Sequence, residues 1–183
     1  MYRRALAIAA SAVLAFTLIP SVAEAAAPNV EIVPGHTSTL GEKNSRFFCP
    51  ANEVITGRAH QKDENGPTTY WCGKIVIDGE QVSVSTYHYV DAQTEPFSWF
   101  EAPEANAMVG REHRGDENGV TTTYFALLTW RGQPVKLVNR RWTGALRESR
   151  HESRASGDEI MTGRRHHDDE NGDSFYQYAT VTF

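Results

Sequence analysis

The sequence predicts an all-β domain made of three repeats, and two observations carry this prediction. The decapeptide GRAHQKDENG at Gly57–Gly66 returns as GREHRGDENG at Gly110–Gly119 and as GRRHHDDENG at Gly163–Gly172, each time after 53 residues. A fixed period of this length is typical of repeat architectures. The segments between these blocks are rich in Val, Ile, Thr, Tyr and Trp and alternate apolar with polar residues, which favours strands over helices.

The repeats divide the chain into units at about 28–79, 80–132 and 133–183. Asp78-Gly79 and Arg131-Gly132 are tight-turn signals at the ends of the first two units. Since the chain begins and ends where a third such turn would lie, we expect the two termini to be close together.

Each unit is expected to hold four strands. In the first unit they are Val30–Val33, Ser45–Cys49, Val54–Lys62 and Thr68–Ile77. In the third unit Arg150–Arg154 takes the place of the second strand, although it has no apolar side. Three such units predict about twelve strands with pseudo-threefold symmetry. A β-trefoil is favoured, and a β-prism is the alternative.

The first 25 residues resemble a signal peptide. Arg3 and Arg4 precede an apolar stretch at Ala5–Ile19, and Ala23-Glu24-Ala25 fits a cleavage site. The apolar stretch is short for a membrane span. We therefore expect 1–25 to be removed and 26–183 to form a single secreted, monomeric β domain without membrane insertion.

The charge balance limits the partners. The chain has a formal net charge of −5 at pH 7. Nucleic acids and anionic membranes attract basic surfaces, so a nucleic-acid partner is not expected.

Two cysteines, Cys49 and Cys72, lie in the first unit. An even pair in an exported protein predicts a disulfide. In the second unit Cys49 aligns with Ala102, and Cys72 aligns with Ala126. A pair of small residues at these places indicates two positions that face each other on adjacent strands.

The decapeptide places its fixed residues on one face of a strand. In Val54–His60, alternation puts Arg58 and His60 on one side and Gly57 and Ala59 on the other. Ala59 is replaced by Glu112 and by Arg165 in the other copies, which indicates solvent exposure there. The Asn-Gly pair that ends each block predicts a hairpin turn.

Each unit thus offers the same polar set, followed by an aromatic residue. The candidate ligand-binding residues are Arg58, His60, Asp63, Glu64, Asn65, Tyr70, Arg111, His113, Asp116, Glu117, Asn118, Tyr124, Arg164, His166, Asp169, Glu170, Asn171 and Tyr176. Tyr124 is aligned with Tyr70 by allowing one extra Thr in the second copy. A further acid recurs upstream as Glu42, Glu95 and Glu148.

Two interpretations of this set stay open. It can form one polar recognition site per unit, which suits sugar hydroxyls and gains from multivalency. Alternatively it is an internal network in which Arg pairs with acids and His pins the hairpin, since bidentate Arg–carboxylate pairs are geometrically demanding.

Metal binding and catalysis are weaker interpretations. The His and acidic residues lack the full ligand pattern of a zinc or EF-hand site, so no metal and no cofactor are expected. No nucleophile elbow, phosphate loop or His-Glu-x-x-His motif is present, so we do not expect an enzyme.

The four tryptophans Trp71, Trp99, Trp130 and Trp142 do not recur at one repeat position, so they are expected to pack in the core or at its rim. Trp142 and Tyr89 align with each other and could line a groove.

The first unit resembles a dermatopontin-type repeat. It has Phe47-Phe48-Cys49-Pro50, the apolar strand Val54-Ile55-Thr56-Gly57 and then Tyr70-Trp71-Cys72, but it lacks the Asp-Arg-x-Trp block of that family. The whole chain resembles secreted bacterial proteins with Gly-Arg-x-His-x-x-Asp-Glu-Asn-Gly repeats. These resemblances imply an extracellular repeat β protein, with matrix and carbohydrate-binding members in the dermatopontin family.

Together these observations predict a secreted, multivalent, lectin-like protein whose partner is a glycan or cell-surface polysaccharide. The alternative is a secreted structural or protein-interaction module.

Overall fold

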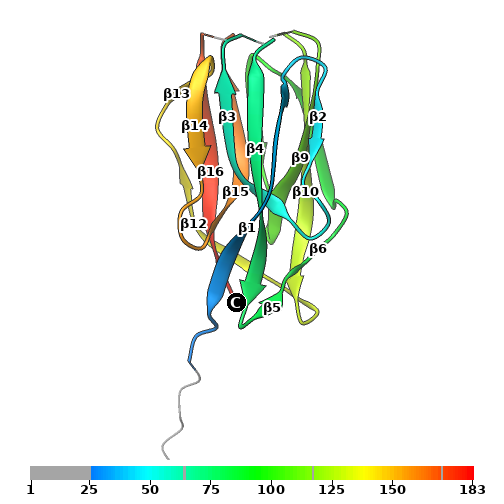
Figure 1. The fold of residues 1–183 in the computed structure, drawn as a ribbon, viewed down its shortest axis with the longest axis vertical. Coiled ribbons are helices and arrows are strands. Elements are labelled where there is room, and N and C mark those ends of the chain that lie inside the picture. Colours follow the sequence, from blue (N-terminus) through cyan, green and yellow to red (C-terminus); the bar gives the residue numbers. More distant parts are fainter. Residues whose placement is uncertain (1–25, 64, 117, 170) are drawn as a thin grey trace, which may run out of the picture.

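A computed structural model describes residues 26–63, 65–116, 118–169 and 171–183 (Figure 1). The predicted signal peptide, 1–25, lies outside these residues, and so do Glu64, Glu117 and Glu170. Within the described ranges the chain forms sixteen strands and no helix. The all-β prediction is confirmed, whereas the preference for a β-trefoil over a β-prism stays a prediction.

The strands form three antiparallel sheets, which we number after the repeat that supplies most of each. Sheet 1 has the order β1 (Val30–Gly41), β4 (Pro67–Ile77), β3 (Val54–Gln61) and β14 (Arg150–Arg154), with β5 (Glu80–Gln81) paired to β4. Sheet 2 has the order β11 (Gln133–Pro134), β10 (Val120–Trp130), β9 (Asn106–Arg114) and β2 (Arg46–Phe48), with β6 (Ser83–Val84) and β7 (Tyr89–Thr94) paired to β10. Sheet 3 has the order β12 (Lys136–Trp142), β16 (Asp173–Thr182), β15 (Glu159–His167) and β8 (Phe97–Glu101), with β13 (Leu146–Arg147) paired to β16.

The sheets exchange their edge strands in a cycle. Repeat 1 supplies β2 to sheet 2, repeat 2 supplies β8 to sheet 3, and repeat 3 supplies β14 to sheet 1. These are the predicted second strands of the three units. No repeat therefore completes a sheet alone, and the backbone pairing of each sheet depends on at least two repeats.

The strand count exceeds the expected twelve because the first strand of a unit differs between repeats. In repeat 1 it is the twelve-residue strand β1, with a register shift between Pro34 and Thr37. In repeat 2 it divides into β6 and β7, and in repeat 3 β12 and β13 both pair with β16. The short strands β5 and β11 follow the predicted turns at Asp78-Gly79 and Arg131-Gly132.

Strand β14 forms as predicted although it has no apolar side. Its inward positions are His151 and Ser153, and both are buried. His151 bonds the phenol oxygen of Tyr176 at 2.6 Å, and the hydroxyl of Ser153 bonds that of Tyr178 at 2.8 Å. Polar contacts inside the molecule thus replace the usual apolar face.

The interior is layered along the long axis. At the end that carries both termini of the described chain, an apolar cluster includes Val54, Leu128 and Ile160. A second apolar cluster, which includes Ile55, Phe125 and Met161, lies beside it. The third strand of each repeat (β3, β9 or β15) continues past these clusters to the fixed Arg and then to the fixed His. The hairpin turns that follow these strands lie at the opposite end of the molecule (Figure 1).

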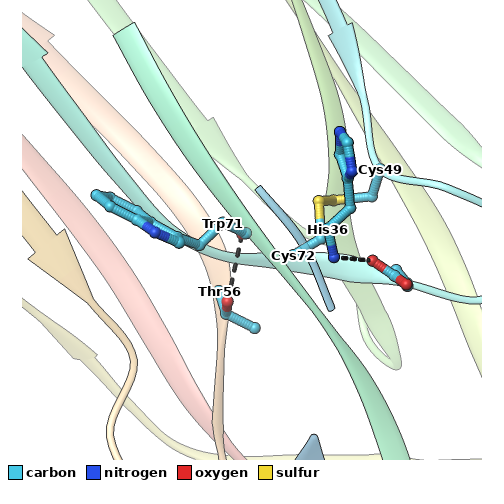
Figure 2. Close-up of a disulfide and its surroundings, with 6 residues drawn as sticks. His36, Cys49, Thr56, Trp71 and Cys72 are labelled. Carbon is cyan, nitrogen blue, oxygen red and sulfur yellow. Dashed lines mark hydrogen bonds between the residues drawn. A yellow bond between two sulfur atoms is a disulfide. The ribbon is translucent and has the colours of Figure 1, made fainter. Parts of the chain in front are cut away.

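The predicted disulfide joins Cys49 to Cys72, with 5.8 Å between their Cα atoms. Figure 2 shows the bond beside His36. Cys72 lies on β4, the strand that also carries Trp71. The bond links the end of β2, which belongs to sheet 2, to β4 in sheet 1. It therefore ties the exchanged strand back to its own repeat.

The strand register corrects the residue that was aligned with Cys72 in the second repeat. Ile55 pairs with Cys72, Met108 with Phe125 and Met161 with Tyr178. The residue equivalent to Cys72 in the second repeat is thus Phe125 rather than Ala126. The disulfide prediction was right, but the argument from two facing alanines was not.

Candidate functional site

The three repeated arginines lie on the inside of the molecule and are buried. Arg58, Arg111 and Arg164 are each 1% exposed. They meet the three recurring acids Glu42, Glu95 and Glu148, which are also buried. These six side chains form what we call the ionic ring.

The ring is closed, with arginine and glutamate alternating. Arg58 lies 2.8 Å from Glu42 and 2.9 Å from Glu148. Arg164 lies 3.3 Å from Glu148 and 2.7 Å from Glu95. Arg111 lies 3.2 Å from Glu95 and also pairs with Glu42, which closes the circle. Each arginine thus binds the glutamate of its own repeat and that of the preceding one.

The pairing explains how six charges can be buried together. Three guanidinium groups balance three carboxylates, and every carboxylate faces two arginines. Although burial by itself raises the pKa of Glu95, the charges of Arg164 and Arg111 hold it at about 2. The arginines likewise hold the pKa values of Glu42 and Glu148 well below the usual range against the opposing effect of burial.

Each glutamate of the ring accepts a hydrogen bond from a hydroxyl group, which also bonds a histidine. Thr68 donates to Glu42, Thr121 to Glu95 and Ser174 to Glu148. The same hydroxyls bond Nδ1 of the histidines, at 2.8 Å for His60, 3.0 Å for His113 and 3.1 Å for His166. This layer connects the ring to the hairpin turns.

The histidines hold these turns and are kept neutral by their surroundings. His60 Nε2 bonds the carbonyl oxygen of Asp63 at 3.1 Å, and His113 Nε2 bonds that of Asp116 at 3.0 Å. Burial and the adjacent arginine lower the pKa of His60, and the same causes lower the pKa of His113 and of His166. A fourth histidine, His151, bonds Arg58, and burial lowers its pKa to about 4.

The acidic turns are hairpin turns, as predicted. The Asp63 carboxylate accepts the backbone N–H of Asn65 at 3.0 Å, and its carbonyl accepts that of Gly66 at 2.8 Å. A Cβ atom at Gly66 would lie 1.8 Å from the carbonyl oxygen of Gln61. Glycine is therefore required because the backbone passes so closely, and Gly119 and Gly172 meet the same restriction.

The predicted site residues consequently divide into an inner and an outer group. The inner group is buried and comprises Arg58, His60, Tyr70, Arg111, His113, Arg164, His166 and Tyr176. The outer group lies exposed on the turns and comprises Asp63, Asn65, Asp116, Asn118, Asp169 and Asn171. The inner arginines and histidines are bonded as in the second interpretation, and His166 also lines a surface groove.

The structure corrects the place given to Tyr124. Tyr70 pairs with Arg58 and Tyr176 pairs with Arg164, but Arg111 pairs with Thr123. The repeats are thus in register without an extra Thr. Tyr124 is the counterpart of Trp71 on the outer face, where its hydroxyl bonds Glu112 at 3.1 Å.

A groove with a volume of about 530 Å³ lies on the outer face of sheet 3. Its lining includes Phe97, Trp99, Arg165, His167, Phe175 and Asp173. Phe97 is 66% exposed and Trp99 is 53% exposed, which is unusual for such large apolar side chains. We call this feature the sheet 3 groove.

Aromatic rings surround an arginine beside this groove. The guanidinium carbon of Arg165 lies 4.8 Å from the ring centre of Trp99 and 4.7 Å from those of Trp142 and Phe175. Such contacts are favourable cation–π interactions. Trp142 contacts Trp99 and Arg165, but it is not among the residues that line the groove, and its counterpart Tyr89 packs on Phe125 in sheet 2.

The other two sheets do not carry this aromatic set. One repeat period from Trp99 stand Arg46 and Glu152, and one and two periods before Phe175 stand Thr122 and Thr69. Sequence reasoning missed the groove because it searched for what the repeats share. The available signal was the opposite one: the aromatic residues Phe97, Trp99 and Phe175 stand at outward strand positions whose equivalents in the other repeats are not aromatic.

Among the described residues, no group of three or more His, Cys, Asp or Glu side chains is placed to hold a metal ion. The described part of the chain also contains no helix that is long and apolar enough to cross a membrane. Comparison of the chain with protein-family models, curated proteins and solved structures finds no match.

Proposed function

We propose that this protein is a secreted glycan-binding protein that binds its ligand in the sheet 3 groove. The observation that carries the proposal is the exposure of Phe97 and Trp99 in a groove rimmed by polar side chains. Ligand sites are typically concave and mostly apolar, with a few polar groups that orient the ligand. The signal-peptide pattern and the disulfide are consistent with secretion.

Of the repeated polar set, the lining of the groove contains His166 and Asn171. The repeated arginines and histidines are bonded to one another inside the molecule, so the triple motif does not argue for three binding sites. Phe97, Trp99 and Phe175 have no aromatic equivalents in the other repeats, which favours one principal site per molecule.

A screen of immobilised glycans and insoluble polysaccharides tests the proposal. Wild-type protein should bind at least one glycan, and Trp99→Ala should bind the same glycan more weakly. Trp71→Ala is the matched control, because Trp71 also stacks with an arginine, Arg154, but on sheet 1. Glycan binding by Trp99→Ala that is as strong as that of the wild type would contradict the proposed site.

The second candidate is a structural or protein-interaction module. It is favoured by the ionic ring, which accounts for the triple motif without any ligand. Under this alternative, a folded protein binds none of the glycans, and substitutions in the groove leave every sugar-binding signal at background.

A further inference from the structure

We propose that the sheet 3 groove takes a neutral glycan chain of at least two pyranose units, which lies along β8. This inference rests on the proposed function and specifies its ligand class and orientation. The groove, the backbone of β8 and the local charges carry it.

The two exposed rings are spaced for consecutive sugars. Phe97 and Trp99 are two residues apart on β8 and point outward, while Ser98 and Phe100 point inward. Alternate residues of a strand are about 6.6 Å apart along its axis. Two neighbouring pyranose rings can therefore each place a C–H face on one aromatic ring, and their hydroxyls can bond the rim.

The platform is held in place before any ligand arrives. β8 is the edge strand of sheet 3, but the side-chain amide of Gln93 bonds both backbone groups of Trp99, accepting from its N–H at 2.8 Å and donating to its carbonyl at 2.6 Å. The Trp99 ring also meets Trp142 edge-on at 5.9 Å, and Phe97 meets His167 at 4.7 Å. A site that is already ordered loses less conformational entropy on binding.

The charges at the groove balance one another, which favours a neutral sugar. Arg147 and Arg165 are matched by Asp168 and Asp173 among the lining residues. Arg165 is engaged by aromatic rings, and Arg147 donates to the carbonyl oxygen of Asn171 at 3.1 Å. An acidic polysaccharide would meet two carboxylates here, on a chain whose net charge is −5.

The test is a titration of the intrinsic tryptophan fluorescence, checked by calorimetry. The probes are glucose, cellobiose and cellohexaose, the corresponding N-acetylglucosamine series, and polygalacturonate as the acidic chain. We expect the neutral chains to bind more tightly than their monosaccharides and more tightly than polygalacturonate. Phe97→Ala and Trp99→Ala should each weaken the binding about tenfold, which corresponds to about 1.4 kcal/mol, while Trp71→Ala should not.

Each contrary outcome has a distinct meaning. Tighter binding of polygalacturonate, reduced by Arg147→Gln, would overturn the neutral ligand class and leave glycan binding intact. Equal affinity for glucose and cellohexaose would overturn the extended orientation along β8. Binding of none of these sugars by a folded protein, together with a negative glycan screen, would overturn the proposed function itself.

Discussion

Arg164 and Arg165 are neighbours on β15, yet they belong to two different parts of the molecule. Arg164 points inward, is 1% exposed and binds Glu95 and Glu148 in the ionic ring. Arg165 points outward and stacks among three aromatic rings beside the groove. The first is an arginine in all three repeats, whereas the second is replaced by Ala59 and Glu112.

This difference separates two causes of sequence constraint within one chain. The ring needs the same residues in every repeat, because each arginine contacts glutamates from two repeats. The outer faces do not contact one another in this way, so they are free to differ. Repetition therefore marks the structural network, and departure from repetition marks the surface on which we place the ligand.

Of the predicted effects on the free energy of unfolding, that of acid should be the largest. The folded protein keeps its buried histidines neutral, but the unfolded chain takes up their protons below about pH 6.5. The ring glutamates stay ionised in the folded state, but they take up protons in the unfolded chain below about pH 4.3. The histidines and the ring glutamates both have a lower pKa in the folded protein than in the unfolded chain. They therefore stabilise the fold at neutral pH, and this stabilisation is lost as the pH falls.

Urea denaturation between pH 8 and pH 3 measures this effect. The free energy of unfolding should decrease below about pH 6.5 and more steeply below about pH 4.3, with each group contributing up to about 1.4 kcal/mol per pH unit. A stability that stayed constant down to pH 3 would contradict the ring as described.

Breaking the ring by substitution should come next. Glu42→Ala leaves Arg58 and Arg111 each without one of their two carboxylates, in a buried position. Loss of one partner of a buried ion pair typically costs about 3–5 kcal/mol. Urea denaturation at pH 7 measures the cost, with the exposed Glu152→Ala as control. Equal stability of the two variants would show that the pairing is unimportant.

Removing the disulfide should cost slightly less. The double variant Cys49→Ala/Cys72→Ala frees β2 from its own repeat but leaves its pairing with β9. We expect a loss of about 2–4 kcal/mol, which is typical of such bonds. Thermal unfolding of the variant beside the wild type measures it, and an unchanged melting temperature would contradict the role of the bond as a tie between sheets.

Tyr176 and Thr123 occupy equivalent positions beside the ionic ring, and their hydroxyl groups should contribute differently to stability. The hydroxyl of Tyr176 bonds Arg58 at 2.7 Å and His151 at 2.6 Å. The hydroxyl of Thr123, its counterpart one repeat earlier, is buried without a hydrogen-bond partner among the described residues. Tyr176→Phe should cost about 1–3 kcal/mol, whereas Thr123→Val should be close to neutral. If Thr123→Val lowered the free energy of unfolding more than Tyr176→Phe, the difference described between the two positions would be wrong.

The smallest stability effect is expected on the outer face. Trp99 is half exposed, and exposed substitutions usually change stability by about 0.5 kcal/mol or less. Trp99→Ala should therefore unfold close to the wild type while its glycan binding falls. A loss of several kcal/mol would make Trp99 a structural residue.

The fold was predictable from the sequence where a local pattern decides it. Strand alternation placed Arg58 and His60 on one face and Ala59 on the other; Arg58 and His60 are buried, whereas Ala59 is half-buried rather than exposed. The Asn-Gly pairs correctly gave the hairpins. The hydrophilic strand β14 was also placed correctly, since its position in the repeat outweighed its composition.

The long-range arrangement was beyond a local pattern. Nothing in a single repeat reveals that β2, β8 and β14 cross to another sheet, and the ring depends on that exchange. The glutamates were noted as recurring acids, but their partners are up to 90 residues away in sequence, as for Arg58 and Glu148. The aligned tyrosines misled because two tyrosines and a threonine share one position.

The most direct test of the central claim compares the two neighbouring arginines. Arg164→Gln and Arg165→Gln remove the same charge one residue apart, and urea denaturation at pH 7 measures the free energy of unfolding of each variant. We predict a loss of about 3–5 kcal/mol for Arg164→Gln and about 1 kcal/mol or less for Arg165→Gln. Small and equal losses, with glycan binding abolished by Arg164→Gln, would contradict the account and return the repeated set to the role of a binding site.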